Sequence, residues 1–195
     1  MPLFESDVIV GADDLGHDVK FFGATSGRHL LWDQSQDQLE FKDNTKAIFG
    51  DGEDLQILHD GTQNLITSNT SNIKFIQNAN DKDIIFQSDN GSGGVKTYFF
   101  LDGSVSATVF PDSSKLYFGT GHDAYIDHDG TNTYFNNQTG SLIIRTSTDD
   151  ADLILQCDDG SGGTAAYITL DGSAARTVFS QHTAHIDNKK AFFGS

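Results

Sequence analysis

Short apolar stretches recur about every ten residues along the chain, with turn-forming residues between them. Within residues 46–110 these stretches are 47–49, 55–58, 65–66, 73–76, 84–86, 98–101 and 108–110. This spacing is typical of β-strands, and no stretch keeps the period of an amphipathic helix. Asp-Gly pairs at 60–61, 102–103, 129–130 and 171–172 fit tight turns, in which glycine accepts a positive φ. The pattern predicts an all-β protein with little helix.

The pattern is also duplicated. Residues 46–110 align without a gap on residues 115–179 at an offset of 69 (115 − 46), and about two in five aligned positions are identical. The shared motifs include K-x-x-F-G-x-G, I-x-H-D-G-T, Q-x-D-x-G-S-G-G and Y-x-x-L-D-G-S. A gapless duplication indicates tandem structural units. We expect β-repeats at 46–114 and 115–183.

The flanks look like partial copies of the same unit. Gly16–Phe21 parallels Gly52–Ile57 and Gly121–Ile126, so residues 1–45 are interpreted as an N-terminal partial module and a candidate attachment region. Residues 190–194 restart the K-x-x-F-G motif. The segment 184–195 is therefore either the start of a third repeat or a strand that closes the second.

Two apolar runs, 84–86 and 153–155, present apolar side chains to both faces of a strand. One 69-residue unit that is rich in Gly and Asp has little apolar area with which to offset the ordering of its loops. Identical chains that wrap a shared axis would cover both faces and close the sheet edges. The predicted architecture is an elongated repeat protein, an intertwined homotrimeric β-fibre of the β-helix or β-prism type.

Charge narrows the range of partners. The chain has 28 Asp and Glu against 12 Lys and Arg, a formal net charge of −16. A nucleic acid or an anionic membrane would be repelled, and no apolar run has the roughly 20 residues of a membrane helix. The first residues show no signal-peptide pattern.

A single cysteine, Cys157, excludes an intrachain disulfide, and its apolar neighbours predict a small buried side chain.

Histidines are the first candidates for metal binding. His59 and His128 occupy equivalent positions, each just before an Asp-Gly pair, and a trimer axis would gather three copies of each. His182 and His185 are spaced H-x-x-H, which on a strand directs the two rings to opposite faces. We favour hydrogen-bonding surface histidines over metal ligands, because a metal site needs converging rings.

Acidic loops are the second candidates. Asp127–Asn132 resembles the start of an EF-hand loop but lacks the bidentate Glu at the twelfth position. Asp89–Gly94 and Asp158–Gly163 have oxygen ligands for weak calcium binding, although a hairpin loop explains them better. We therefore predict no metal-binding or cofactor-binding residues, and no cofactor.

No sequence motif of a catalytic nucleophile, zinc protease or P-loop is present, and we predict no catalytic residue and no enzyme. Trp32, Tyr117, Tyr125 and Tyr134 are candidates for stacking on sugars. The 15 Phe residues at strand spacing are interpreted as core.

The chain resembles structural proteins of marine tailed bacteriophages and cyanophages. The resemblance rests on Gly16–Gly27 followed by Leu31–Asp33, and on the tandem K-x-x-F-G-x-G, D-L-x-I-x-H-D-G and D-D-G-S-G-G stretches with their closing L-D-G-S and T-V-F. It implies a tail-fibre-like virion subunit, generally trimeric, whose outer parts touch the host surface. A shaft fragment, a short fibre and a decoration protein all fit it.

The expected function is therefore that of a structural virion appendage that forms a trimeric shaft or tip and contributes to host adhesion. The expected partners are two further copies of the chain, other phage tail or virion proteins and a host surface glycan, and the expected location is the virion, assembled in the host cytoplasm. The alternative is a stand-alone carbohydrate- or calcium-binding β-module of a bacterial surface protein. A stable trimer supports the first, and a compact monomer that binds glycan supports the second.

Overall fold

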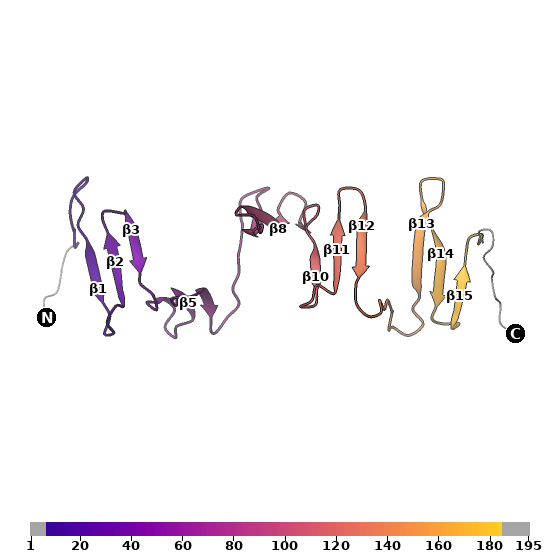
Figure 1. Cartoon of the computed structure of the whole chain (residues 1–195), viewed down its shortest axis with the longest axis horizontal. Helices are drawn as coiled ribbons and strands as arrows, with labels where there is room; N and C mark the ends of the chain where they lie inside the picture. The colour runs from indigo at the N-terminus through magenta and orange to yellow at the C-terminus, as the bar shows by residue number, and fades with distance from the viewer. Residues whose placement is uncertain (1–6, 185–195) are drawn as a thin grey trace. The chain divides into compact units, whose positions relative to one another are not determined.

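A computed structural model describes residues 7–184, in which all regular structure is β-strand (Figure 1). The predicted all-β class is confirmed. The strands form small sheets of three consecutive strands each, and in β1-β2-β3, β4-β5-β6, β10-β11-β12 and β13-β14-β15 neighbouring strands pair antiparallel. The chain divides into two compact units, Met1–Ile84 with Asp102–Val105, and Ile85–Leu101 with Ser106–Ser195.

The first unit contains two complete sheets. One is β1-β2-β3 and the other is β4-β5-β6. Their strands are β1 Val19–Phe22, β2 His29–Asp33, β3 Gln38–Phe41, β4 Ala47–Phe49, β5 Leu55–His59 and β6 Asn64–Ser68. Each middle strand pairs with both neighbours, as expected where short turns connect successive strands.

Three further three-stranded sheets follow: β7-β8-β9, β10-β11-β12 and β13-β14-β15. Their strands are β7 Ile84–Asp89, β8 Val95–Asp102, β9 Ala107–Val109, β10 Leu116–Phe118, β11 Ala124–His128, β12 Thr133–Asn137, β13 Leu153–Asp158, β14 Thr164–Asp171 and β15 Arg176–Phe179. Strands β13 and β14 form a long hairpin with a register shift between Leu155 and Gln156.

Strand positions follow the sequence offset. Strand β5 begins at Leu55 and β11 at Ala124, and the difference is again 69 (124 − 55). The Asp-Gly turns at 60–61 and 129–130 both close the hairpin after these strands, and the Gly-rich segments after Gln87 and Gln156 both connect the next long pair. Gly61 and Gly130 have φ of 96° and 97°, as the Asp-Gly pattern predicts.

The other two Asp-Gly pairs were interpreted wrongly. Gly103 and Gly172 do not have positive φ, and the left-handed residues of those turns are Ser106 and Ala175. Glycine is needed for a different reason: a Cβ on Gly103 or Gly172 would lie 2.4 Å from the backbone oxygen of Lys82 or Ala151. The backbone passes too close for a side chain.

The N-terminal segment also differs from expectation. We paralleled Gly16–Phe21 with the residues that lead into a middle strand, whereas Val19–Phe22 forms the first strand of its sheet. Instead, Asp33 lies 69 residues before Asp102 (102 − 33), and both carboxylates accept a hydrogen bond from a serine two residues later. The N-terminal sheet therefore corresponds to the second sheet of the repeat, not to the first.

Two predicted strands are absent. The apolar run 73–76 and its equivalent 142–145 have no strand assignment, and Ile76 and Ile143 are 70% and 75% exposed. A strand requires a neighbouring backbone with which to form a ladder, and these runs have none within the part of the chain that the structure describes.

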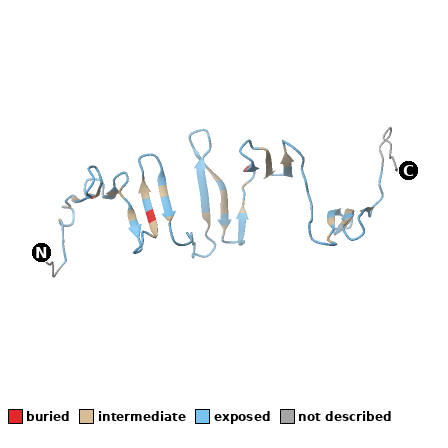
Figure 2. Ribbon diagram, turned by 90° about the horizontal axis from the view of Figure 1, so that it is seen from below, coloured by how far each residue is buried: buried red, intermediate tan, exposed pale blue. Residues whose placement is uncertain are grey.

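Most of the described chain is exposed or half-buried (Figure 2). Among residues 7–184 the one buried hydrophobic side chain is Leu31, at 8% exposure. The predicted burial of Cys157 is wrong, because Cys157 is exposed on β13. The phenylalanines do not form a core within one chain either, because Phe49 and Phe135 are 54% and 60% exposed.

Candidate functional site

One face is apolar in each of the four sheets β1-β2-β3, β4-β5-β6, β10-β11-β12 and β13-β14-β15. Residues directly opposite each other on paired strands share a face, and alternate residues on one strand lie on the same face. In β4-β5-β6, Ile57 lies opposite both Ala47 and Ile66. In β10-β11-β12, its equivalent Ile126 lies opposite Leu116 and Phe135. We call this side of each sheet the apolar face.

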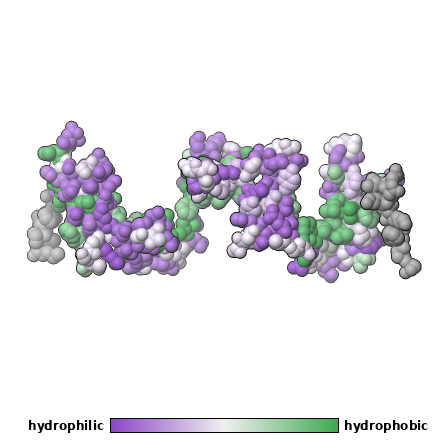
Figure 3. Space-filling model, in the orientation of Figure 1, coloured by the Kyte–Doolittle hydropathy of each residue, from purple (hydrophilic) through white to green (hydrophobic). Residues whose placement is uncertain are grey.

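The apolar faces have the same character in both units. The apolar side chains on these faces are Val19, Phe21, Leu30, Trp32, Leu39 and Phe41 in β1-β2-β3; Ala47, Phe49, Leu55, Ile57 and Ile66 in β4-β5-β6; Leu116, Phe118, Ala124, Ile126 and Phe135 in β10-β11-β12; and Leu153, Leu155, Ile168, Leu170 and Phe179 in β13-β14-β15. Polar residues toward the strand ends share these faces: His59, Asn64, Ser68, His128, Thr133, Asn137 and Thr177. Hydrophobic surface is visible over several segments of the described chain (Figure 3). Within residues 7–184, large side chains on these faces are exposed rather than covered by a second layer.

The exposure of individual side chains measures this deficit. Phe49, Ile57 and Ile66 are 54%, 43% and 55% exposed, and Phe118 and Phe135 are 50% and 60% exposed. Large exposed apolar patches on a soluble chain mark interaction surfaces. The apolar faces are therefore the main candidate functional surface.

The opposite faces differ between sheets. That of β4-β5-β6 has Ile48, Leu58 and Leu65 beside Gln56 and Thr67, whereas that of β1-β2-β3 is mainly polar. In β1-β2-β3, Leu31 lies on this side between Lys20 and Glu40, its cross-strand partners. The long stems of these charged side chains can cover an apolar neighbour while their ends stay in water. This arrangement accounts for the burial of Leu31 in a sheet that has no second layer.

His59 is half-buried and His128 is exposed, and each pairs with an aspartate. The Nδ1 atom of His59 lies 2.8 Å from Asp43 Oδ1, and the Nδ1 atom of His128 lies 3.0 Å from Asp112 Oδ1. These contacts tie the end of the middle strand to the segment before the sheet. Among residues 7–184 no group of three or more His, Cys, Asp or Glu side chains is arranged to hold a metal ion. His182 is outside any strand, and His185 lies outside the described residues.

The Gly-rich loops use their side-chain oxygens internally. Asn90 Oδ1 accepts hydrogen bonds from the N–H groups of Ser92 and Gly94 at 2.8 and 3.2 Å. Asp159 Oδ1, its equivalent, accepts from Ser161 and Gly163 at 2.7 and 3.0 Å. An amide and a carboxylate thus serve the same role. In both repeats, the Oδ1 atom at this position therefore serves to close its own loop.

The EF-hand-like segment Asp127–Asn132 forms a strand end and a hairpin turn. Asp127 lies on β11. Asp129 Oδ1 accepts hydrogen bonds from the N–H groups of Thr131 and Asn132 at 2.9 and 2.8 Å. Asp60 makes the same contacts with Thr62 and Gln63 in the first repeat.

Hydrogen bonds to these turns shift the acidity of their carboxyl groups. The N–H of Gln63 and then that of Thr62 hold the pKa of Asp60 below its ordinary value. The N–H of Asn132 does the same for the pKa of Asp129, and that of Ser161 for the pKa of Asp159. In Asp33, Asp102 and Asp171 the serine hydroxyl two residues later is the main cause of the lowered pKa.

The lowered pKa values predict a loss of stability in acid. A carboxyl group whose pKa is lower in the folded state stabilises that state above its unfolded pKa, about 4, and this contribution disappears as the pH falls through the folded pKa. The melting temperature should therefore hold between pH 7 and 5 and fall below about pH 4. Thermal unfolding followed by circular dichroism checks this. An unchanged melting temperature down to pH 2 would contradict it.

Asp159→Asn provides the matched control for the acid effect. The first repeat already has Asn90 at this position, with the same two N–H donors. The variant should fold normally and lose less stability between pH 5 and pH 2 than the unchanged protein.

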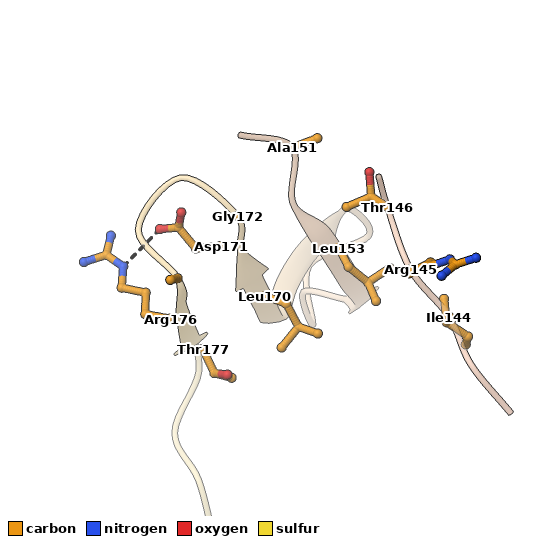
Figure 4. A pocket seen from close by; sticks show the side chains of 11 residues that line it. Ile144, Arg145, Thr146, Ala151, Leu153, Leu170, Asp171, Gly172, Arg176 and Thr177 are labelled. Atoms are coloured by element: carbon orange, nitrogen blue, oxygen red, sulfur yellow. Dashed lines mark hydrogen bonds and ion pairs between the residues drawn. The ribbon is translucent and has the colours of Figure 1, made fainter. Parts of the chain in front are cut away.

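A groove of about 430 Å³ lies between the segment 144–146 and the end of the β13-β14-β15 sheet (Figure 4). Ile144, Leu153 and Leu170 supply apolar side chains, and Arg176 Nε donates to Asp171 Oδ2 at 3.0 Å. The groove lining contains no His, Cys, Lys or Ser. Leu153 and Leu170 also belong to the apolar face, so the groove is part of that surface.

The sugar-stacking candidates occupy two different sheets. Trp32 lies on the apolar face of β1-β2-β3, where it is opposite Val19 and Leu39. Tyr117, Tyr125 and Tyr134 lie together on the face of β10-β11-β12 opposite its apolar face. Sequence reasoning named all four but missed this division, because it depends on strand register.

Comparisons with protein-family models, curated proteins and solved structures found no match to this chain. Among residues 7–184 no helix is long and apolar enough to cross a membrane. The candidate surface is therefore interpreted from its own residues and geometry.

Proposed function

We propose that the chain is a structural subunit of a phage virion appendage, a tail fibre or a similar fibre, that assembles as a homotrimer and contributes to adhesion to the host. The observation that carries this proposal is the apolar face on each of the four antiparallel sheets. Burying a large apolar side chain contributes about 1.5–3 kcal/mol. A surface of this extent stabilises an assembly, whereas it is a liability on a free monomer.

A threefold arrangement suits the sheets. Three copies around an axis turn each apolar face inward and leave the opposite face outward. Each sheet of three strands also has two open edges, which neighbouring chains can cover in a closed ring. The unpaired apolar runs 73–76 and 142–145 fit such a ring, because a neighbouring chain can supply the backbone partner that their own chain lacks.

The repeated strand order supports a fibre. The sequence offset places equivalent strands in the two repeats, and a unit that cannot cover its own apolar surface is stabilised by stacking and association. The virion assignment rests on the resemblance to structural proteins of marine tailed phages. The net charge of −16 is consistent with a partner other than nucleic acid.

Molar mass in solution tests the assembly. Light scattering coupled to size-exclusion chromatography should give about three times the chain mass of 21.2 kDa at micromolar concentration. Cooperative unfolding whose midpoint rises with protein concentration should accompany it. A folded monomer of 21.2 kDa would overturn the proposal, and a monomer stabilised by calcium or glycan would favour the stand-alone binding module.

A further inference from the structure

We propose that the polar side of the β10-β11-β12 sheet is a binding face for a neutral glycan. Tyr117 on β10 lies directly opposite Tyr125 on β11, and Tyr134 on β12 lies opposite Asp127, the next residue of β11 on that side. Three tyrosines thus lie on one side of one sheet, one from each strand; the three strands are labelled in Figure 1. We call this surface the tyrosine face.

The rings combine apolar faces with polar groups. The centroids of Tyr117 and Tyr125 are 5.4 Å apart with an interplanar angle of 63°. Tyr117 and Tyr134 are 42% and 43% exposed. Asn136 Nδ2 donates to the Tyr125 hydroxyl at 3.2 Å, and Lys115 Nζ lies 4.1 Å from the centre of the Tyr125 ring. The side chains of the face are therefore oriented by their neighbours.

The fold does not require these tyrosines. In β4-β5-β6 the equivalent positions, 69 residues earlier, are Ile48, Gln56 and Leu65. The β4-β5-β6 sheet has the equivalent strands, the same Asp-Gly turn and the same His–Asp pair, but none of the three tyrosine rings. The apolar faces, in contrast, remain apolar in both repeats. The aromatic rings and hydroxyls of the tyrosine face are therefore a difference between the repeats, at positions where the first repeat has two aliphatic side chains and an amide.

The tyrosine face is accessible in the proposed trimer. If the apolar face turns toward the axis, the opposite side of the same sheet turns toward solvent, so the accessibility of this site rests on the proposed function. Three chains would display three tyrosine faces. Several weak contacts to one glycan-coated surface then combine into stronger attachment.

The chemistry selects a neutral sugar. The C–H groups on one side of a pyranose ring pack against the negative face of an aromatic ring. Hydroxyls of the sugar can donate to and accept from the tyrosine hydroxyls. A net charge of −16 repels acidic polysaccharides and nucleic acids. The predicted ligand is an uncharged hexose or N-acetylhexosamine oligosaccharide.

Saturation-transfer NMR on the full chain tests the site. The probes are maltohexaose, mannohexaose, galactohexaose and chitohexaose, with saturation of the tyrosine ring protons. At least one probe should receive saturation at its ring C–H protons. Tyr117→Ala combined with Tyr134→Ala should weaken that binding at least tenfold, whereas Ile48→Ala combined with Leu65→Ala, at the equivalent positions, should leave it unchanged.

Each outcome bears on one proposal. No saturation transfer to any probe, or transfer that survives in the double tyrosine variant, would overturn the glycan site. Tyr117→Phe with Tyr134→Phe keeps the rings, so it separates loss of stacking from loss of folding and should weaken binding less than the alanine pair. Light scattering on the same samples reports trimer formation independently, so failure of the assembly is distinguishable from failure of the glycan site.

Discussion

Replacing Ile57 with Asp will abolish formation of the proposed trimer. Ile57 lies at the centre of the apolar face of β4-β5-β6, with Ala47 and Ile66 opposite it, and it is 43% exposed in the single chain. Association would bury three unpaired carboxylates near one axis, each at a cost of several kcal/mol. Sedimentation velocity should show species no larger than a monomer, with loss of the cooperative unfolding transition.

The adjacent residue is the control. Leu58 lies on the other face of the same strand, and its equivalent in the second repeat is already an aspartate, Asp127. Leu58 is half-buried. Leu58→Asp introduces the same charge one residue away and should leave the proposed trimer intact, with a change in unfolding free energy of about 1 kcal/mol. Equal effects of the two substitutions would show that the apolar face is not the assembly surface.

Replacing Gly172 with Ala will destabilise the turn between β14 and β15 by about 2–4 kcal/mol, within the range of overpacking and strain effects. The added Cβ would lie 2.4 Å from the Ala151 backbone oxygen, and relief requires movement of the main chain. The same movement would disturb the hydrogen bond that Gly172 N donates to Asp152 Oδ1 at 2.9 Å. Denaturant unfolding of the two proteins measures the difference.

Gly162→Ala separates crowding from backbone strain. Gly162 has φ of 91°, but nothing lies within 4 Å of a Cβ placed there. Alanine in this loop should cost about 1–2 kcal/mol, the penalty for a left-handed conformation. A Gly162 variant that is as unstable as the Gly172 variant would contradict the explanation by close approach.

Local features of this protein could be read from its sequence. The duplication places strand β11 at 69 residues after β5, and the alternation of apolar residues marks both. The turns at Asp60-Gly61 and Asp129-Gly130 could be predicted from the sequence. In each turn the aspartate oxygen accepts a hydrogen bond from an N–H two residues later, and the glycine has a positive φ. These interactions are local, so a window of sequence contains all of the groups that make them.

Other features needed contacts between distant segments. The apolar run 73–76 has the composition of a strand, yet no backbone within the described chain pairs with it. Gly103 and Gly172 look like ordinary turn glycines, and only their distance to Lys82 and Ala151 shows why they lack side chains. The position of Val19–Phe22 likewise became clear from its pairing with β2, because the Gly-x-Asp motif before it occurs in both kinds of sheet.

The sequence by itself determined that the chain is all-β, duplicated and acidic, because composition and periodicity are properties of residues near one another along the chain. It also marked Tyr117, Tyr125 and Tyr134 as possible sugar-stacking residues. Only the tertiary structure decided that these three rings share one face of β10-β11-β12. It also decided that Ile57 and Ile66 share one face of β4-β5-β6, where both are exposed. The reason is register: each strand alternates between two faces, and which residues meet depends on how separate strands align.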